Sequence, residues 1–326
     1  MTRGHKAVTI YPENAVIMAP LSGYTDLPFR RSLRRHGCVY AFTPLVEAGS
    51  IVYDNPRAPS IVARGDDEKW LGIQLLGSDL ARIKTAVRKI SHLRFDVLDF
   101  NMGCPVRKVT RRGAGAALGH TPEFAAECVQ AIADLSPFPV TGKIRVLDHE
   151  DPAPTVRFAR LLESAGCQAL TIHGRLWRKV YSGPVAVDVI NAVREAVTIP
   201  VIANGGVTDA LSAAALRRAT GCSRIMLARG AIGNPWLFDT INGGKPPGHE
   251  ELCAELVNHI RDMVAFHGEE NGIKVGRKII VAYLAGRGYS RDLRGEVTGL
   301  HSWAMFSAWM ARVRATGPSV GFQRRS

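Results

Sequence analysis

The sequence has no paired cysteines and no long apolar runs. Its six cysteines are scattered along the chain, and no two of them form a Cys-x-x-Cys pair. This spacing argues against a zinc ribbon or a disulfide framework and fits a reducing compartment. No run of about 18 apolar residues is present, as a transmembrane helix would need, and residues 1–11 lack the apolar segment of a signal peptide. We therefore expect a cytoplasmic protein with no membrane span and no metal site.

The composition also lacks the bias of a disordered chain. Hydrophobic residues make up 46% and charged residues 22% of the 326 positions, which is typical of globular proteins. The formal net charge is +13, and it is unevenly spread, because residues 271–326 contain ten Lys or Arg and only two acidic residues. A basic C-terminal segment of this kind is either a solvated helical surface or a surface that binds nucleic acid.

Eight short apolar runs alternate with helical patterns over most of the chain. The runs span residues 15–19, 39–42, 71–76, 95–100, 140–145, 169–173, 200–203 and 224–227, and the helical patterns span residues 80–90, 122–135, 154–165, 187–197 and 209–219. Continuous apolar runs are typical of parallel strands that helices cover. The alternative, an open doubly wound sheet, would gather its polar residues at one switch point. Here polar residues stand at the ends of most strands, which predicts a closed (β/α)8 TIM barrel.

A Gly- and Pro-rich stretch, residues 242–247, separates this pattern from the rest of the chain. Only helical patterns follow it, over residues 250–267, 273–284 and about 293–313. We therefore predict two domains, a catalytic barrel over residues 1–242 and a small all-helical domain over residues 249–326. The basic C-terminal segment belongs to the second of them.

One cysteine stands in an unusual setting. Cys104 follows a predicted strand in the sequence Asn101-Met-Gly-Cys-Pro105, and a glycine-rich stretch, residues 113–118, comes soon after it. Free cysteines are most often small buried residues, but a position at the mouth of a barrel favours chemistry. Four cations follow Cys104: Arg107, Lys108, Arg111 and Arg112. They could lower the pKa of its thiol or bind the phosphate backbone of an RNA. The alternative is that they only form a solvated loop surface.

Two strand ends that carry glycines predict a phosphate site. Gly205 and Gly206 follow the seventh predicted strand, and Arg229 and Gly230 follow the eighth. Glycines let backbone N–H groups approach an anion, and the corresponding loops of (β/α)8 barrels often bind phosphate. The alternative is that these glycines only make tight turns. Other strand-end residues suit a flat heteroaromatic cofactor; they are Met18, Ala19, Pro20, Gln74, Asn101, Lys143 and His173.

The sequence resembles the tRNA-dihydrouridine synthases from about residue 14 to residue 238. The most specific element is Asn101-Met-Gly-Cys-Pro105 with the following Gly113-Ala-Gly-Ala-Ala-Leu118. Shorter matches lie at Met18-Ala-Pro20, Gln74-Leu-Leu-Gly77, Gly142-Lys-Ile-Arg145, His173-Gly-Arg175, Ala203-Asn-Gly205 and Ala228-Arg-Gly230. The glycine pairs among them are shared by many flavin barrels.

This resemblance implies an FMN-bound barrel, a helical tRNA-recognition domain and NADPH as the reductant. It implies that a uridine in tRNA is reduced to 5,6-dihydrouridine, with a hydride from reduced FMN to C6 and a proton from Cys104 to C5. Cysteine thiols are ordinarily protonated at neutral pH, as a proton donor must be, and the uridine has to leave its stack to reach a barrel mouth. Carried over by motif, the FMN-binding residues are Met18, Ala19, Pro20, Gln74, Lys143, His173, Asn204, Gly205, Gly206, Arg229 and Gly230. The substrate-binding residues are Asn101, Arg175, Arg107, Lys108, Arg277 and Lys278, with His173 also near the uracil.

The chain departs from the family pattern at Leu176-Trp-Arg-Lys179, at Val187, and at Ile279 and Ala282 in the helical domain. Two other functions fit the same residues. One is flavin-dependent reduction of a free pyrimidine or another small ene-carbonyl compound, and the other is RNA binding by a catalytically silent relative. The basic helical segment argues against the first, and the intact Cys104 motif and phosphate loops argue against the second. We expect a monomer that acts on tRNA.

Overall fold

The computed structural model describes residues 10–319, and the strands of this part of the chain form one parallel sheet. The sheet runs in the order β2-β1-β9-β8-β7-β6-β5-β4-β3, and every neighbouring pair is parallel. The strands are β1 (Val16–Met18), β2 (Tyr40–Ala41), β3 (Val46–Glu47), β4 (Gly72–Leu76), β5 (Val97–Met102), β6 (Val140–Arg145), β7 (Leu170–His173), β8 (Val201–Asn204) and β9 (Arg224–Leu227). Each of the eight predicted runs overlaps a strand, and β3 is an addition to them.

The sheet closes on itself because its two edge strands, β2 and β3, belong to one continuous stretch of chain. β2 pairs with β1, and β3 pairs with β4. Between them Phe42 bridges to Gly72 of β4, and the Thr43 N–H donates to the Gly72 carbonyl oxygen at 2.9 Å. A side chain at Gly72 would collide with the Phe42 ring, so this seam requires glycine. The predicted (β/α)8 TIM barrel is thereby confirmed.

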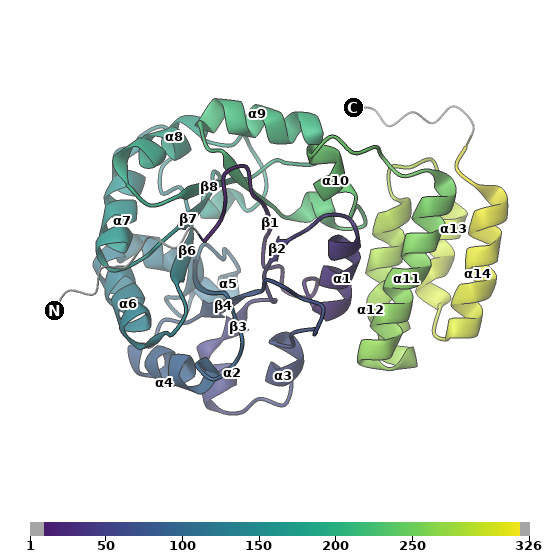
Figure 1. Cartoon of the computed structure of the whole chain (residues 1–326), viewed down its shortest axis with the longest axis horizontal. Helices are drawn as coiled ribbons and strands as arrows, with labels where there is room; N and C mark the ends of the chain where they lie inside the picture. The colour runs from purple at the N-terminus through teal and green to yellow at the C-terminus, as the bar shows by residue number, and fades with distance from the viewer. Residues whose placement is uncertain (1–9, 320–326) are drawn as a thin grey trace. The chain divides into compact units, whose positions relative to one another are not determined.

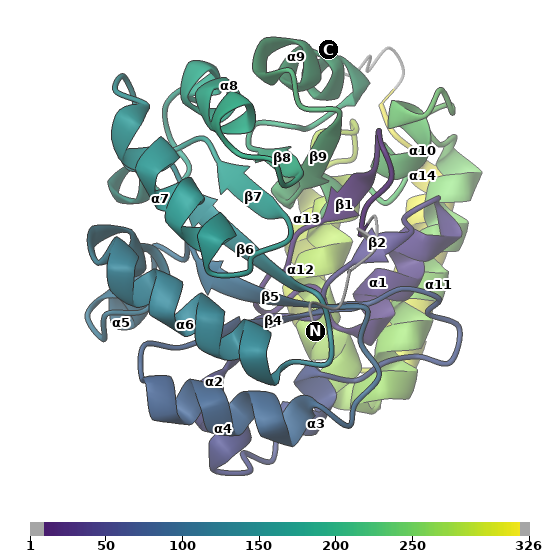
Figure 2. The ribbon, with the colours of Figure 1, turned by 60° about the vertical axis from the view of Figure 1, so that its left-hand side comes forward.

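Helices cover the outside of the barrel strands, as Figures 1 and 2 show for α4, α6, α7 and α8. The helices of this part of the chain are α2 (Ala48–Val52), α3 (Ala58–Ile61), α4 (Leu80–Ile90), α5 (Arg107–Thr110), α6 (Pro122–Leu135), α7 (Ala153–Ser164), α8 (Val187–Ala196) and α9 (Ala210–Thr220), with the short 3-10 helices η1 (Gly115–His120) and η2 (Trp177–Lys179). In α4 the Asp79 carboxylate caps the first turn by accepting from the Arg82 N–H at 2.9 Å. Its apolar face is buried, as the sequence periodicity predicts.

The described chain divides into two compact units. The first holds the residues up to Gly23, Val39–Val207 and Leu211–Ala228, and hence the barrel strands. The second holds Tyr24–Cys38, Thr208–Ala210 and the chain from Arg229 onward. Its helices are α1 (Leu27–Arg35), α10 (Leu237–Ile241), α11 (His249–His267), α12 (Glu269–Leu284), α13 (Arg291–Glu296) and α14 (Trp303–Thr316), with single turns η3 (Arg229–Ala231) and η4 (Val297–Gly299). No helix in residues 10–319 is long and apolar enough to cross a bilayer.

The prediction of one helix over residues 293–313 is wrong. The chain forms α13 and η4, breaks at Leu300–Ser302, and then forms α14. Ser302 starts the new helix, because its hydroxyl oxygen accepts from the Met305 N–H at 3.3 Å. The apolar pattern continues across the break, and it was this continuity that suggested a single helix.

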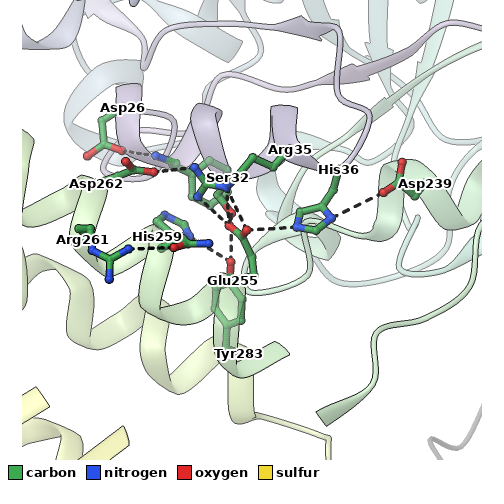
Figure 3. A network of polar contacts seen from close by, with 12 residues as sticks. Asp26, Ser32, Arg35, His36, Asp239, Glu255, His259, Arg261, Asp262 and Tyr283 are labelled. Atoms are coloured by element: carbon green, nitrogen blue, oxygen red, sulfur yellow. Dashed lines mark hydrogen bonds and ion pairs between the residues drawn. The ribbon is translucent and has the colours of Figure 1, made fainter. Parts of the chain in front are cut away.

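A buried polar network joins α1 to α11 and α12 within the second unit (Figure 3). Glu255 accepts from Ser32 Oγ at 2.7 Å and from Arg35 Nη2 at 2.8 Å. The Tyr283 hydroxyl lies 3.0 Å from Ser32 Oγ and 3.1 Å from His259 Nδ1. Burial raises the pKa of Glu255, but its hydrogen bonds outweigh that effect and hold the pKa at about 2, while burial lowers the pKa of His259 to about 4. The network therefore keeps Glu255 charged and His259 neutral at physiological pH.

Candidate active site

A row of polar side chains lies across three neighbouring strands of the barrel. Asp99 of β5 pairs in register with Gln74 of β4 and with Thr141 of β6. Gln74 Nε2 donates to Asp99 Oδ2 at 2.6 Å, and Thr141 Oγ1 donates to Asp99 Oδ1 at 2.7 Å. Burial raises the pKa of Asp99 to about 6, against the opposing effect of these two hydrogen bonds and of Lys143. Because a carboxylate can only accept, the amide nitrogen of Gln74 must face Asp99.

Asn101 continues this row to the loop that carries Cys104. Its Nδ2 donates to Gln74 Oε1 at 2.7 Å. Its Oδ1 accepts from the backbone N–H groups of Gly103 at 3.1 Å and Cys104 at 2.9 Å. The orientations of the Gln74 and Asn101 side-chain amides are thus fixed. The Asp99 carboxylate at one end of the chain only accepts, and the backbone N–H groups at the other end only donate. The turn that presents Cys104 is held by a chain of hydrogen bonds rooted in the barrel interior.

Cys104 is half-buried, whereas the other five cysteines are buried. The glycine-rich stretch packs directly on it: the Ala116 N–H donates to the Cys104 carbonyl oxygen at 3.0 Å. Gly115 adopts φ +61°, and a side chain there would approach that same oxygen to 2.7 Å. Glycine is therefore needed at this position both for its backbone conformation and for the close contact.

Lys143 of β6 is a half-buried cation with a single acceptor among the described residues. Its ammonium donates to Asn204 Oδ1 of β8 at 3.1 Å, and Asn204 Nδ2 donates to the Met226 carbonyl oxygen of β9 at 2.7 Å. Burial, together with the nearby charge of Arg145, lowers the pKa of Lys143 to about 8. An ammonium held in this way is available to an electron-rich group in the barrel mouth.

The structure brings the predicted residues of β7 and β8 together. His173 ends β7, is buried, and pairs in register with Asn204. Gly205 and Gly206 follow with φ +135° and +74°, a conformation that other residues rarely adopt. A side chain at Gly205 would lie 3.2 Å from the His173 ring and 3.5 Å from the guanidinium of Arg175. Glycine is therefore favoured at both positions by the backbone conformation, and at Gly205 also by the close approach of His173 and Arg175.

The remaining predicted residues are distributed over both units. Met18, Ala19 and Pro20 are buried at the end of β1, where the Ala19 N–H donates to the Leu227 carbonyl oxygen at 2.8 Å. Arg229 and Gly230 open η3 directly after β9 and belong to the second unit.

The predicted RNA-contacting residues also differ in their surroundings. Arg107 and Lys108 are exposed in α5, close in sequence to Cys104. In α12, Arg277 Nε donates to the Leu300 carbonyl oxygen at 2.8 Å, and the Lys278 ammonium lies 4.2 Å from the centroid of the Tyr24 ring. Both side chains thus have partners within the second unit.

Sequence reasoning missed three residues of the site, Asp99, Thr141 and Arg145. Asp99 and Arg145 are charged residues inside strands that are otherwise buried, and charged residues are almost never buried without partners. That signal was present in the sequence. Thr141 gave no comparable signal, because threonine is common in strands.

A cavity of about 770 Å³ lies elsewhere in the barrel unit, between the α2–α3 segment and residues 89–95. None of the predicted site residues lines it. Two of its cations are engaged: Lys89 pairs with Asp54 at 2.8 Å, and Arg64 Nη1 donates to the Arg94 carbonyl oxygen at 2.8 Å. The convergent polar groups are those around Cys104, and the candidate active site is therefore the barrel mouth. Within residues 10–319 no group of three or more His, Cys, Asp or Glu could hold a metal ion.

The chain is similar to known proteins over most of its length. The family model "Dihydrouridine synthase (Dus)" matches residues 17–304. tRNA-dihydrouridine synthase B of Pasteurella multocida is 32% identical over 281 residues, which cover 84% of this chain and 85% of that protein. A probable tRNA-dihydrouridine synthase of Rhodobacter capsulatus is 34% identical over 274 residues, 81% of this chain and 84% of that protein.

Among solved structures, histamine dehydrogenase from Rhizobium sp. 4-9 aligns with a TM-score of 0.54 at 13% identity, over 96% of this chain and 64% of that one. At that identity the likeness concerns the fold alone. The family match, by contrast, runs from β1 through the Cys104 loop to the start of α14, and the curated relatives cover more than four fifths of the chain. The chain therefore belongs to the dihydrouridine synthase family.

Proposed function

We propose that this protein is an oxidoreductase that reduces a uridine in tRNA to 5,6-dihydrouridine, with FMN as cofactor and NADPH as reductant. The observation that carries the proposal is the half-buried Cys104, presented by a turn that Asn101, Gln74 and Asp99 hold from within the barrel. Membership of the dihydrouridine synthase family and the names of the curated relatives support the substrate.

The residues of the barrel fit FMN in two respects. The half-buried ammonium of Lys143 has one acceptor among the described residues and suits an electron-rich ring. The left-handed backbone at Gly205 and Gly206 suits a phosphate. The chemistry that FMN supplies when bound is transfer of a hydride to C6 of the uracil, with NADPH as the electron source. The residues that would hold it are Met18, Ala19, Pro20, Gln74, Lys143, His173, Asn204, Gly205, Gly206, Arg229 and Gly230.

Cys104 would complete the reduction by donating its proton to C5 of the uracil. The thiol becomes a thiolate in that step, and two cations, Lys143 and Arg145, lie on β6, the strand that pairs with the one leading into the Cys104 turn. Positive charge stabilises an anion that forms nearby, so these side chains would favour the product of the proton transfer. Asn101 and Arg175 would hold the uracil, which has to be flipped out of its stack to reach this depth.

The tRNA would be bound by exposed cations of the barrel, Arg107 and Lys108, and by the helical domain over residues 249–326, including Arg277 and Lys278. Neutralised phosphates release counterions, so affinity for tRNA falls steeply with salt. NADPH would visit the flavin and leave, because the sequence contains no Gly-x-Gly-x-x-Gly fingerprint on a strand-turn-helix unit.

The decisive experiment compares Cys104→Ala with a matched cysteine variant, Cys128→Ala. Cys128 is buried in α6, away from the barrel mouth. With transcript tRNA, FMN and NADPH, we expect Cys104→Ala to lower the rate of dihydrouridine formation at least about a hundredfold, since general acids contribute that much or more. FMN binding, measured by flavin absorbance, should be the same in both variants.

Each outcome of this experiment bears on the proposal. Full activity of Cys104→Ala removes Cys104 from the acid role. Wild-type protein that binds no FMN, or that reduces free uridine as fast as tRNA, refutes the proposed cofactor or the proposed substrate respectively.

A further inference from the structure

Arg145, the last residue of β6, is a buried guanidinium without a carboxylate partner among residues 10–319. Only 5% of its surface is exposed. Burial lowers its pKa to about 10, and the neighbouring Arg175 adds to this effect, while Tyr181 and Cys104 oppose it. Burying an arginine without a counter-ion costs free energy, and its hydrogen bonds have to offset that cost.

These hydrogen bonds reach two different loops. On one side Arg145 Nε donates to the Gly103 carbonyl oxygen at 2.8 Å, in the residue directly before Cys104. On the other side Nη1 lies 2.9 Å from the Val180 carbonyl oxygen, 3.1 Å from that of Arg175 and 3.4 Å from that of Leu176. A single planar group thus spans the Cys104 turn and the loop between β7 and α8.

The β7–α8 loop packs on the rest of the barrel unit through the Trp177 ring, whose centroid lies 6.2 Å from that of the His120 ring. Its turn η2 closes on itself, with the Lys179 N–H donating to the Leu176 carbonyl oxygen at 3.1 Å and the Val180 N–H to that of Trp177 at 3.2 Å. Val180 has φ +49° and ψ −81°, a conformation that β-branched residues seldom adopt and that persists only where the surroundings impose it. Its carbonyl accepts the shortest of the three Nη1 hydrogen bonds.

We propose that Arg145 is a positioning residue that couples the Cys104 turn to the β7–α8 loop, so that the proposed proton donor and the loop beside Arg175 keep one fixed arrangement. Lysine cannot replace it, because a single ammonium lacks the fork of donors that reaches both loops. The effect on catalysis rests on the proposed function, whereas the coupling of the loops does not.

Two readouts that need neither RNA nor reductant test the coupling on the purified full-length chain. The first is trypsin cleavage after Arg178 or Lys179, both exposed in η2, mapped by mass spectrometry. The second is the rate of N-ethylmaleimide addition to Cys104, the half-buried cysteine. Hydrogen bonds to charged groups correspond to about a factor of ten or more each. In Arg145→Met we therefore expect both rates to rise about tenfold or more.

Arg217→Met is the matched control. Arg217 Nε donates to the Ser223 carbonyl oxygen at 3.0 Å and its Nη2 to that of Asn14 at 2.8 Å, so it also ties two segments of the barrel unit through backbone carbonyls. We expect it to lower the urea midpoint without changing cleavage in η2 or alkylation of Cys104. Arg145→Lys keeps a charge and gives a folded variant if Arg145→Met fails to fold; it should raise at least one of the two rates, because it cannot reach both loops.

With tRNA, FMN and NADPH, Arg145→Met should lower kcat for dihydrouridine formation about tenfold or more, with a smaller change in the KM for tRNA. The inference is overturned if both cleavage and alkylation stay within about twofold of wild type in Arg145→Met and Arg145→Lys. It is also overturned if only one rate changes in Arg145→Met, or if Arg217→Met raises both. A wild-type protein that forms no dihydrouridine would refute the proposed function and leave the loop measurements valid.

Discussion

Two neighbouring glycines allow the packing around Cys104 to be tested with a matched pair of substitutions. Gly113 and Gly115 both have left-handed φ angles, +73° and +61°, so alanine at either position costs about 1–2 kcal/mol in backbone strain. They differ in the space around them. A Cβ at Gly113 would have Ser78 Cβ as its nearest contact, at 3.8 Å, whereas a Cβ at Gly115 would lie 2.7 Å from the Cys104 carbonyl oxygen and 2.9 Å from Val109 Cγ1.

Overpacking adds about 1–3 kcal/mol, so Gly115→Ala should lose about 2–5 kcal/mol of unfolding free energy and Gly113→Ala about 1–2 kcal/mol. Urea unfolding measures both losses. Because the clash is with the backbone of Cys104 itself, Gly115→Ala should also displace the proposed proton donor and lower dihydrouridine formation far more than Gly113→Ala does. Equal losses of stability and activity in the two variants would refute the idea that the glycine-rich stretch is packed on Cys104.

Three other expectations follow from the same structure. Gln74→Met removes the amide between Asp99 and Asn101 and should lower unfolding free energy by about 1–3 kcal/mol; an unchanged urea midpoint would contradict the chain of hydrogen bonds. The pKa of His259 is about 4 in the folded chain and about 6.5 in the unfolded chain. Between these values only the unfolded chain binds the proton, so the unfolding free energy should fall by about 3 kcal/mol as pH drops from 6.5 to 4. Urea unfolding at a series of pH values should find a smaller loss in His259→Gln. Lys108→Gln should make the log–log salt slope of tRNA affinity shallower by about 0.7–0.9, while Arg312→Gln, whose guanidinium is already paired with Glu296, should leave it unchanged.

The barrel was predictable because each of its strands is a local apolar run, but its seam was not. The run over residues 39–42 indicated one strand, whereas the chain pairs with β1 at Tyr40–Ala41 and then with β4, first through Phe42 and Thr43 and, after Pro44, through β3. Proline has no N–H to offer a neighbouring strand, and here it lies between the two short strands β2 and β3. The closing contact of Phe42 with Gly72 depends on the shape of the barrel and leaves no local pattern in the sequence.

The candidate site was predictable where a motif names its residues and unpredictable where partners are distant in the sequence. Asn101 and Cys104 were identified from one short element, and they share hydrogen bonds within it. Asp99 supports Asn101 only through Gln74, which is on another strand. In the same way, α1 could not be assigned to the helical unit from its sequence, because its anchor Glu255 lies 223 residues from Ser32.

Several cations of the C-terminal segment, residues 271–326, have partners within the protein. Two of its ten cations, Arg324 and Arg325, lie outside the described residues. Arg277 and Arg287 donate to backbone carbonyl oxygens, and Arg312 pairs with Glu296 through both of its terminal nitrogens. The planar fork of arginine suits such structural bonds, so these charges contribute less to RNA binding than a net count suggests.

The cations of α5, and Arg111 directly after it, differ from those of the C-terminal segment. Arg107, Lys108 and Arg111 are exposed, and within residues 10–319 their side chains form no hydrogen bond or ion pair, whereas the next cation, Arg112, pairs with Glu47 at 3.0 Å. Unpaired charges gain most from a phosphate, since no internal partner has to be given up. On the proposed function, the segment that follows Cys104 would therefore supply more of the electrostatic attraction to RNA per residue than the more basic C-terminal segment.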